Sequence, residues 1–79
     1  MNDAYPMTRD IVFDNNRHLP LLYGEKDKHL HRIASVLQVT IHAKGNHVWI
    51  EGHEQPVKTA HRVLSDLYNH LQESFSLGT

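Results

Sequence analysis

The 79-residue sequence contains no cysteine, and its apolar residues never form a long uninterrupted run. Without thiols the chain has neither a disulfide framework nor thiolate ligands for zinc, so its fold must depend on the packing of apolar side chains. The short apolar runs exclude a membrane-spanning helix, and the N-terminal residues lack the basic and hydrophobic regions of a signal peptide. We therefore expect a cytoplasmic protein that does not associate with membranes.

The chain also lacks a strong charge of either sign and the motifs of common enzymes. Its 8 Lys and Arg residues and 9 Asp and Glu residues leave a formal net charge of -1, whereas an autonomous nucleic-acid-binding domain is usually basic. No nucleophile has a base partner at a fixed spacing, and the 4 glycines do not fit a Gly-x-x-x-x-Gly-Lys phosphate loop. We expect neither catalysis nor a bound cofactor within these residues.

The helices of the chain are predicted from hydrophobic spacing. A short helix over about residues 17–23 is stopped by Gly24, which can take a positive φ there. The next helix carries one apolar stripe at positions i, i+3, i+4 and i+7. A longer helix opens at Glu54-Gln55-Pro56, with proline in the first turn, where it is tolerated. The apolar stripe of the middle helix consists of Leu30, Ile33, Ala34 and Leu37.

Three strands are predicted from β-branched runs and from alternation. The first strand covers residues 10–14 and is followed by a helix cap at residues 14–16. Residues 39–43 and 47–51 alternate around a turn at Lys44-Gly45 and form a hairpin. The pattern predicts an α+β domain over residues 10–71, built from three strands and three helices. Residues 1–9 form a flexible lead-in, and residues 72–79 form a helix end or linker.

The histidines invite a metal-binding interpretation. With a two-residue turn at Lys44-Gly45, His42 and His47 would face each other across the hairpin. Two ligands are too few for zinc, which usually takes three or four. We therefore predict no metal site and treat the histidines as solvated surface residues.

The order of these segments resembles a type I KH domain, in which a Gly-x-x-G loop joins two helices. The resemblance implies a three-stranded antiparallel sheet with three helices packed on one face. Gly24-Glu25-Lys26-Asp27 matches that loop, with Asp27 in place of the second glycine. A closer resemblance is to the N-terminal KH-like domain of the PhoH family, the phosphate-starvation-inducible P-loop ATPases. It covers about residues 10–70 and rests on six segments in order: Phe13-Asp14-Asn15-Asn16-Arg17, Leu22-Tyr23-Gly24-Glu25-Lys26-Asp27, Leu37-Gln38-Val39-Thr40-Ile41, Gly45-Asn46-His47, Ile50-Glu51-Gly52 and Val63-Leu64-Ser65-Asp66-Leu67-Tyr68.

The resemblance implies an accessory domain that assists single-stranded RNA binding, while ATP and Mg²⁺ are bound and ATP is hydrolysed in a downstream domain of the same chain. The loop amides would approach the phosphates. The implied nucleic-acid-binding residues are Gly24, Glu25, Lys26, Asp27, Lys28, Arg32 and Lys44. The alternative is purely structural: Gly24 stops one helix, and the Asp27 side chain caps the next.

Trp49 indicates a second candidate site. It falls out of phase with Val48 and Ile50, on the polar face of its strand, where with Val12 it would make an apolar spot on the sheet. Such a tryptophan can stack on a base, be covered by the tails of its own chain or pack against protein. We favour a protein interface that includes Trp49, Val12 and Phe75, formed with another domain or in a homo-oligomer. This interface is the alternative function if the chain does not contact RNA.

Overall fold

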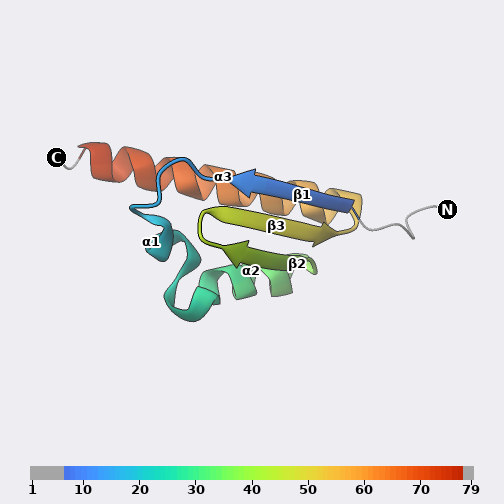
Figure 1. The fold of residues 1–79 in the computed structure, drawn as a ribbon. Helices are drawn as coiled ribbons and strands as arrows, with labels where there is room; N and C mark the ends of the chain where they lie inside the picture. Colours follow the sequence, from blue (N-terminus) through green and yellow to red (C-terminus); the bar gives the residue numbers. More distant parts are fainter. Residues whose placement is uncertain (1–6, 78–79) are drawn as a thin grey trace.

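A computed structural model describes residues 7–77, which form a three-stranded antiparallel sheet with helices on one side (Figure 1). The strand order is β1-β3-β2, so the last strand lies in the centre. This arrangement confirms the predicted α+β class and the predicted sheet. In chain order the segments are β1 (Met7–Val12), α1 (Leu19–Tyr23), the 3₁₀ helix η1 (Glu25–Asp27), α2 (Lys28–Leu37), β2 (Thr40–Lys44), β3 (His47–Gly52) and α3 (Glu54–Leu77).

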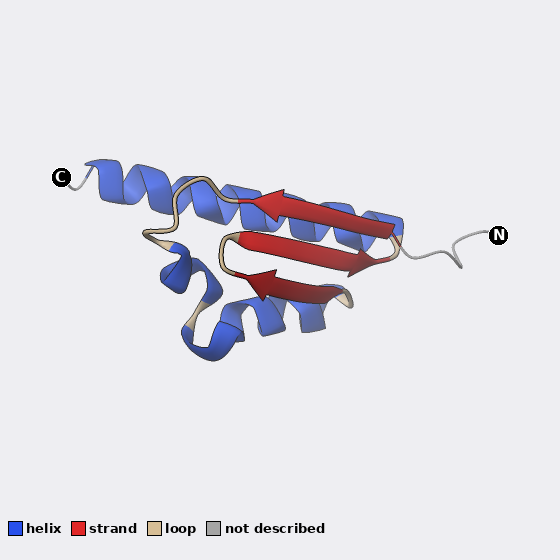
Figure 2. Cartoon of the chain, in the orientation of Figure 1, coloured by secondary structure: helices blue, strands red, loops and turns tan. Residues whose placement is uncertain are grey.

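The core lies between the sheet and two long helices. Helix α3 packs against β1 and β3, and α2 packs against β2 and α3. Figure 2 shows both helices behind the same face of the sheet. Alternation along β3 turns Val48 and Ile50 into this core, where both are fully buried, and turns Trp49 to the other face. The remaining core residues are Phe13, Leu19, Leu22, Tyr23, Leu30, Val39, Val57, Ala60 and Leu64.

The prediction of three helices on one face is not confirmed. Helix α1 has only five residues, and it packs against η1, α2 and α3 rather than on the sheet. Its length is limited at both ends, because Pro20 belongs in a first helical turn and Gly24 ends the helix. Helix α1 lies beyond the ends of the strands, next to the β2–β3 turn (Figure 1).

The first strand and its exit differ from the prediction. Strand β1 begins at Met7, inside the predicted lead-in, of which residues 1–6 lie outside the described part. The helix cap predicted at residues 14–16 is wrong, because α1 begins only at Leu19. Instead, the Asn15 side chain accepts a hydrogen bond from the Arg17 amide at 2.9 Å, closing an Asx turn.

The hairpin turn lies one residue later than predicted. Lys44 pairs with His47, so the two turn residues are Gly45 and Asn46. Gly45 has φ +60°, the left-handed value that a two-residue hairpin turn requires at its first central position. The predicted pairing of His42 with His47 is therefore wrong, and His42 lies opposite Trp49.

Candidate functional site

The junction between α1 and α2 requires a glycine. Gly24 has φ 82° and ψ 168°, a region that other residues almost never adopt. A Cβ atom at this position would lie 2.7 Å from Cγ of His29. The His29 ring cannot easily move away, because Nδ1 lies 3.1 Å from the Leu21 oxygen and 3.2 Å from the Leu22 oxygen. Since both partners are carbonyl acceptors, Nδ1 carries the hydrogen and His29 caps the end of α1.

Two further residues of the loop also have a left-handed backbone. Lys26 has φ 55° and Asp27 has φ 59°, although neither is a glycine. Asp27 occupies the cap position of α2, but its side chain makes no capping hydrogen bond. The predicted capping role of the Asp27 side chain is thus wrong, because a cap residue normally has extended dihedral angles that aim its oxygen at the helix amides. Aspartate is among the few residues that tolerate this left-handed region.

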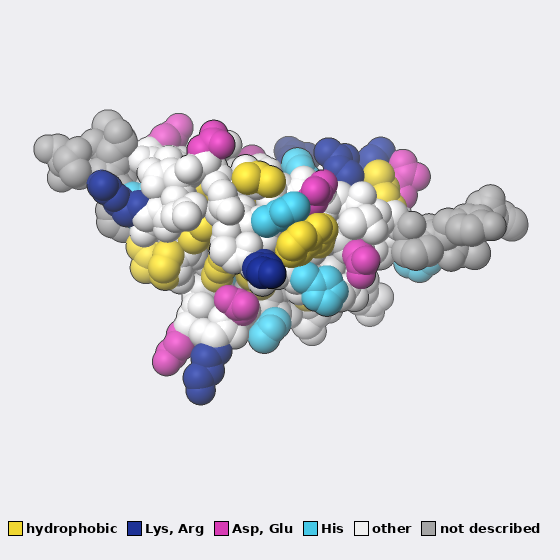
Figure 3. Space-filling model, viewed as in Figure 1, with side chains coloured by type: hydrophobic (Ala, Val, Ile, Leu, Met, Phe, Trp, Pro, Cys, Tyr) yellow, Lys and Arg dark blue, Asp and Glu magenta, His cyan; other side chains and the backbone are white. Residues whose placement is uncertain are grey.

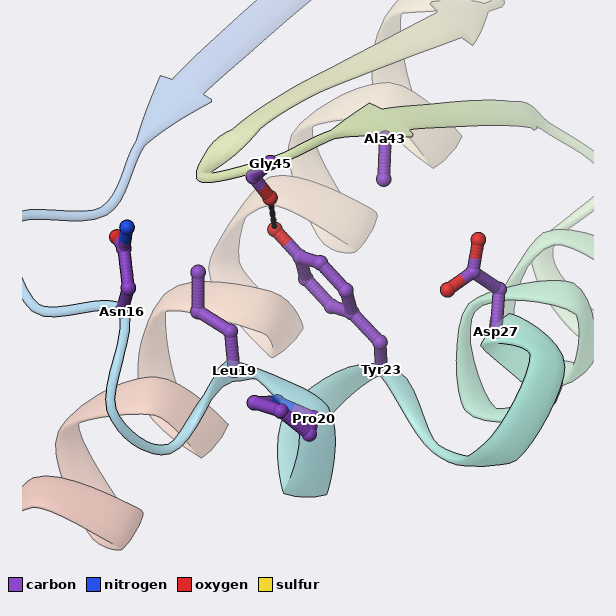
Figure 4. Close-up of a pocket in the computed structure, with 7 residues that line it drawn as sticks. All are labelled: Asn16, Leu19, Pro20, Tyr23, Asp27, Ala43 and Gly45. Carbon is purple, nitrogen blue, oxygen red and sulfur yellow. Dashed lines mark hydrogen bonds between the residues drawn. The ribbon is translucent and has the colours of Figure 1, made fainter.

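A groove lies between this junction and the hairpin (Figure 4). It has a volume of about 360 Å³. Figure 4 shows that Tyr23 points across the groove to the β2–β3 turn, where its hydroxyl donates a hydrogen bond to the Gly45 oxygen at 2.8 Å. The groove is lined by Asn16, Leu19, Pro20, Tyr23, Asp27, Ala43 and Gly45. It therefore combines an apolar surface with a few polar groups, a common composition for a binding site.

The electrostatics of the groove are neutral to negative. Burial, and secondarily the nearby Asp27 carboxylate, raise the pKa of Tyr23 above its usual value, so Tyr23 stays a neutral hydrogen-bond donor at physiological pH. Asp27 is the charged residue among those that line the groove, and none of them is Lys or Arg. A hydrogen-bonding ligand group is therefore better matched to the groove wall than a phosphate.

The structure gathers only part of the predicted RNA site. Glu25 and Lys26 lie exposed on the loop beside the groove. Lys28 starts α2, and Arg32, one turn later, lines a separate apolar crevice between α2 and α3. Lys44 projects from the opposite face of β2 from Ala43, because alternate residues of a strand point to opposite sides. Lys28, Arg32 and Lys44 therefore do not line the groove.

Several groove residues were not predicted as site residues. Leu19, Pro20 and Tyr23 come from α1, and Ala43 and Gly45 come from the hairpin. An aromatic residue directly before the junction glycine was an available signal for Tyr23. Nothing in the local sequence indicated that the hairpin turn would approach α1, since that contact joins residues 22 positions apart.

The residues predicted for a protein interface lie on the other face of the sheet. Figure 3 views this face and shows hydrophobic and histidine side chains gathered over the strands. Trp49 is half-buried, and its ring stacks on that of His47 with centroids 4.0 Å apart and planes inclined by 24°. Val12 is 60% exposed on the same face. Phe75 belongs to α3, but its side chain lies outside the described part of the structure.

Residues 7–77 contain neither a metal-binding cluster nor a membrane-spanning helix. In this part of the chain, no three His, Cys, Asp or Glu side chains are arranged to hold a metal ion. No described helix combines the length and apolar character needed to cross a bilayer. Comparison of the chain with protein-family models, curated protein sequences and solved structures found no match.

Proposed function

We propose that this chain is a KH-like domain that binds single-stranded nucleic acid, RNA in particular, in the groove between α1, the loop and β2. One observation carries the proposal: the helix–loop–helix junction faces a strand across a groove, with a positive φ at both ends of the loop, Gly24 and Asp27. A Gly-x-x-G loop has its glycines at these two positions, and the sequence alone resembled that motif.

The lining of the groove favours a nucleobase over a phosphate. Leu19, Pro20 and Ala43 offer apolar surface on which an unstacked base can lie. The Asp27 carboxylate and the Gly45 carbonyl offer hydrogen-bond acceptors at the edge. Acidic side chains pair with exocyclic amino groups such as N4 of cytosine. We therefore expect cytosine and adenine to bind more tightly than uracil, whose corresponding edge position is a carbonyl oxygen.

The phosphates of the bound nucleic acid would follow the rim of the groove, where Lys26 and the backbone amides of the loop lie. The carboxylates of Glu25 and Asp27 oppose phosphate there, so we expect weak binding with few released counterions and a shallow salt dependence. A weak site suits an accessory role. In the PhoH-type arrangement, this domain would present RNA to an ATPase domain of the same chain, where ATP and Mg²⁺ would be bound and ATP hydrolysed.

The direct test is titration of fluorescein-labelled oligocytidine at low salt, followed by anisotropy. Asp27→Gly restores the second glycine but removes the acceptor proposed for N4 of cytosine, so the preference for oligocytidine over oligouridine should fall by about tenfold, the effect of ~1.4 kcal/mol of lost discrimination. Lys26→Glu should lower the affinity. The matched control is Lys58→Glu on α3, which makes the same charge change at the partner of Glu54 and away from the groove.

Two outcomes would contradict the proposal. If Lys58→Glu weakens binding as much as Lys26→Glu, the interaction depends on total charge alone and the groove is not the site. If excess RNA moves no amide resonance of residues 24–27 in a heteronuclear NMR titration, the chain does not bind RNA through this loop. Oligouridine, titrated in parallel, tests the expected base preference.

A further inference from the structure

The face of the sheet that points away from the helices carries an ordered arrangement of nine side chains, called here the outer sheet face. It lies opposite the proposed RNA groove, because Ala43 faces the groove and its neighbours His42 and Lys44 face outward. The strand register puts the nine in three rows across β1, β3 and β2. The rows are Thr8, Glu51 and Thr40; Asp10, Trp49 and His42; Val12, His47 and Lys44.

A ring stack and two polar contacts join side chains at the centre of this face. The His47 ring stacks on Trp49, and its Nε2 lies 3.0 Å from Oδ2 of Asp10 on the neighbouring strand. On the other side, Nε2 of His42 lies 3.8 Å from Oε1 of Glu51. The stack and the 3.0 Å contact restrict the rings of His47 and Trp49 in the free protein, so ordering these two rings on association should cost less entropy.

The acidic and basic side chains on this face are separated along one diagonal. The carboxylates of Asp10 and Glu51 lie on one side of Trp49, and the imidazoles of His42 and His47 lie on the other. The opposite diagonal runs through Val12, Trp49 and Thr40, none of which is charged. A two-fold axis along this neutral diagonal exchanges the two sides of the face.

Such an axis makes the face complementary to itself. It puts Asp10 against His47 of the second copy and Glu51 against His42 of the second copy. Trp49, Val12 and Thr40 each meet their own image, and Lys44 meets Thr8, so no like charges are opposed. Spacings across and along strands differ by about 2 Å, which side chains can accommodate. The strands of the two sheets would cross near 90°, one of the two common sheet packings.

We propose that the outer sheet face is a self-association surface, on which a second copy of this chain packs face to face with crossed strands and with Trp49 against Trp49. Two carboxylates disfavour a nucleic acid on this face. The nine side chains cover roughly 300 Å² in the plane of the sheet. A stable interface buries about 800 Å² per partner, so the dimer should be weak, with a dissociation constant on the order of 10⁻⁴ M.

The absence of cysteine allows a cross-linking test on a clean background. In Val12→Cys the new thiol lies on the axis and faces its own image, so a bismaleimide about as long as the ~10 Å sheet spacing should link the two copies. In Thr8→Cys the thiol is on the same strand and face but off the axis. We expect several-fold more covalent dimer from Val12→Cys at submillimolar protein. Equal yields from both variants, or no dimer from Val12→Cys, would overturn the proposal.

A charge exchange tests the pairing itself. Asp10→Lys puts a cation against His47 of the second copy, and sedimentation equilibrium should report dimerisation weakened about tenfold. Exchanging the two residues, as Asp10→His with His47→Asp, restores the pair within and between copies and should restore association. Thermal unfolding of each variant checks that the fold is retained. Unchanged association in Asp10→Lys, or no recovery in the exchange variant, would refute this geometry.

Trp49 is the single tryptophan of the chain, so its fluorescence reports on this face alone. Emission should shift on dilution through the dissociation constant. It should stay unchanged when oligocytidine is added to the monomer, because the groove is on the other face of the sheet. An emission change caused by the oligonucleotide and not by dilution would assign the face to nucleic acid instead and would reject self-association. The anisotropy of labelled oligocytidine, measured with the same variants, reports RNA binding in the groove separately.

Discussion

Replacing Gly24 by alanine should destabilise the domain more than any other single methyl addition at a glycine of the described structure. Two features of Gly24 oppose a side chain at this position. Its backbone has dihedral angles that other residues almost never adopt, and the His29 ring occupies the space that a Cβ atom would need. The dihedral angles alone cost an alanine about 1–3 kcal/mol. The new Cβ would also lie within 2.9 Å of three ring atoms of His29. Displacing the ring forfeits its hydrogen bonds to α1, about 1 kcal/mol.

The sum is about 3 kcal/mol, a large part of the stability of roughly 4–12 kcal/mol expected for a domain of this size. Urea denaturation followed by circular dichroism measures it, and the melting temperature should fall by roughly 10–20 °C. The control is Gly45→Ala. Gly45 also has a positive φ, but a Cβ there meets nothing within 4 Å, so only about 1 kcal/mol should be lost.

A double-mutant cycle separates the two terms. In a His29→Ala background the ring is gone, so Gly24→Ala should cost only its backbone part, and the coupling between the two sites should be about 1 kcal/mol. If the two single effects add without coupling, His29 does not restrict this position. If Gly24→Ala costs no more than Gly45→Ala, the assigned backbone conformation of the junction is wrong.

Two further predictions concern pH. The folded-state pKa of Tyr23 is raised, so its stabilising contribution is complete below pH 10 and is lost as pH rises through the folded value. Tyr23→Phe should lose about 1 kcal/mol of stability at neutral pH, because the hydrogen bond to Gly45 is missing. In urea denaturation, the free energy of unfolding of this variant should also fall less steeply at alkaline pH than that of the wild type. The folded-state pKa of His61 is lowered by burial and then by Arg9, so its contribution is present above pH 6.5 and is lost as pH falls through the folded value. His61→Gln does not titrate and should flatten the acid limb of the stability profile, whereas an unchanged limb would refute this assignment.

The sequence predicted what depends on periodicity. The stripe headed by Leu30 gave α2, and the alternation around Trp49 put that residue on the face opposite Val48 and Ile50. Both patterns report which side of a segment meets the core, and burial of apolar surface is the dominant favourable force in folding. Residues on the wrong side of such a pattern are informative, as Trp49 was.

The errors arose where one residue decides the geometry. Moving the hairpin turn from Lys44-Gly45 to Gly45-Asn46 changes every cross-strand partner, because register is set by the turn. The Asn46 side chain also donates a hydrogen bond to the Phe13 oxygen at 2.8 Å, across 33 positions of sequence. Local sequence carries no sign of such a contact, and yet it helps to fix where the turn lies against β1.

Asp27 failed as a predicted cap for a different reason. Its residue type favours a cap, but the loop requires a left-handed backbone at that position, and the dihedral angles decide where the side chain points. As a result, Asp27 lines the groove instead of capping the first turn of α2. A statistical preference for capping was overridden by the geometry of the whole junction, which residue preferences alone do not encode.

The two proposed surfaces are separated by the alternation of a single strand. Ala43 belongs to the groove, whereas His42 and Lys44 belong to the outer sheet face, so a change on one face leaves the other in place. Side chains on opposite faces of β2 point away from each other, so we expect their effects on binding to add. The central strand β3 places Trp49 on the outer sheet face, whereas its Val48 and Ile50 side chains are buried in the core. Under the two proposals, the sheet would carry RNA on one side and a second copy on the other, and neither would have to reshape the fold.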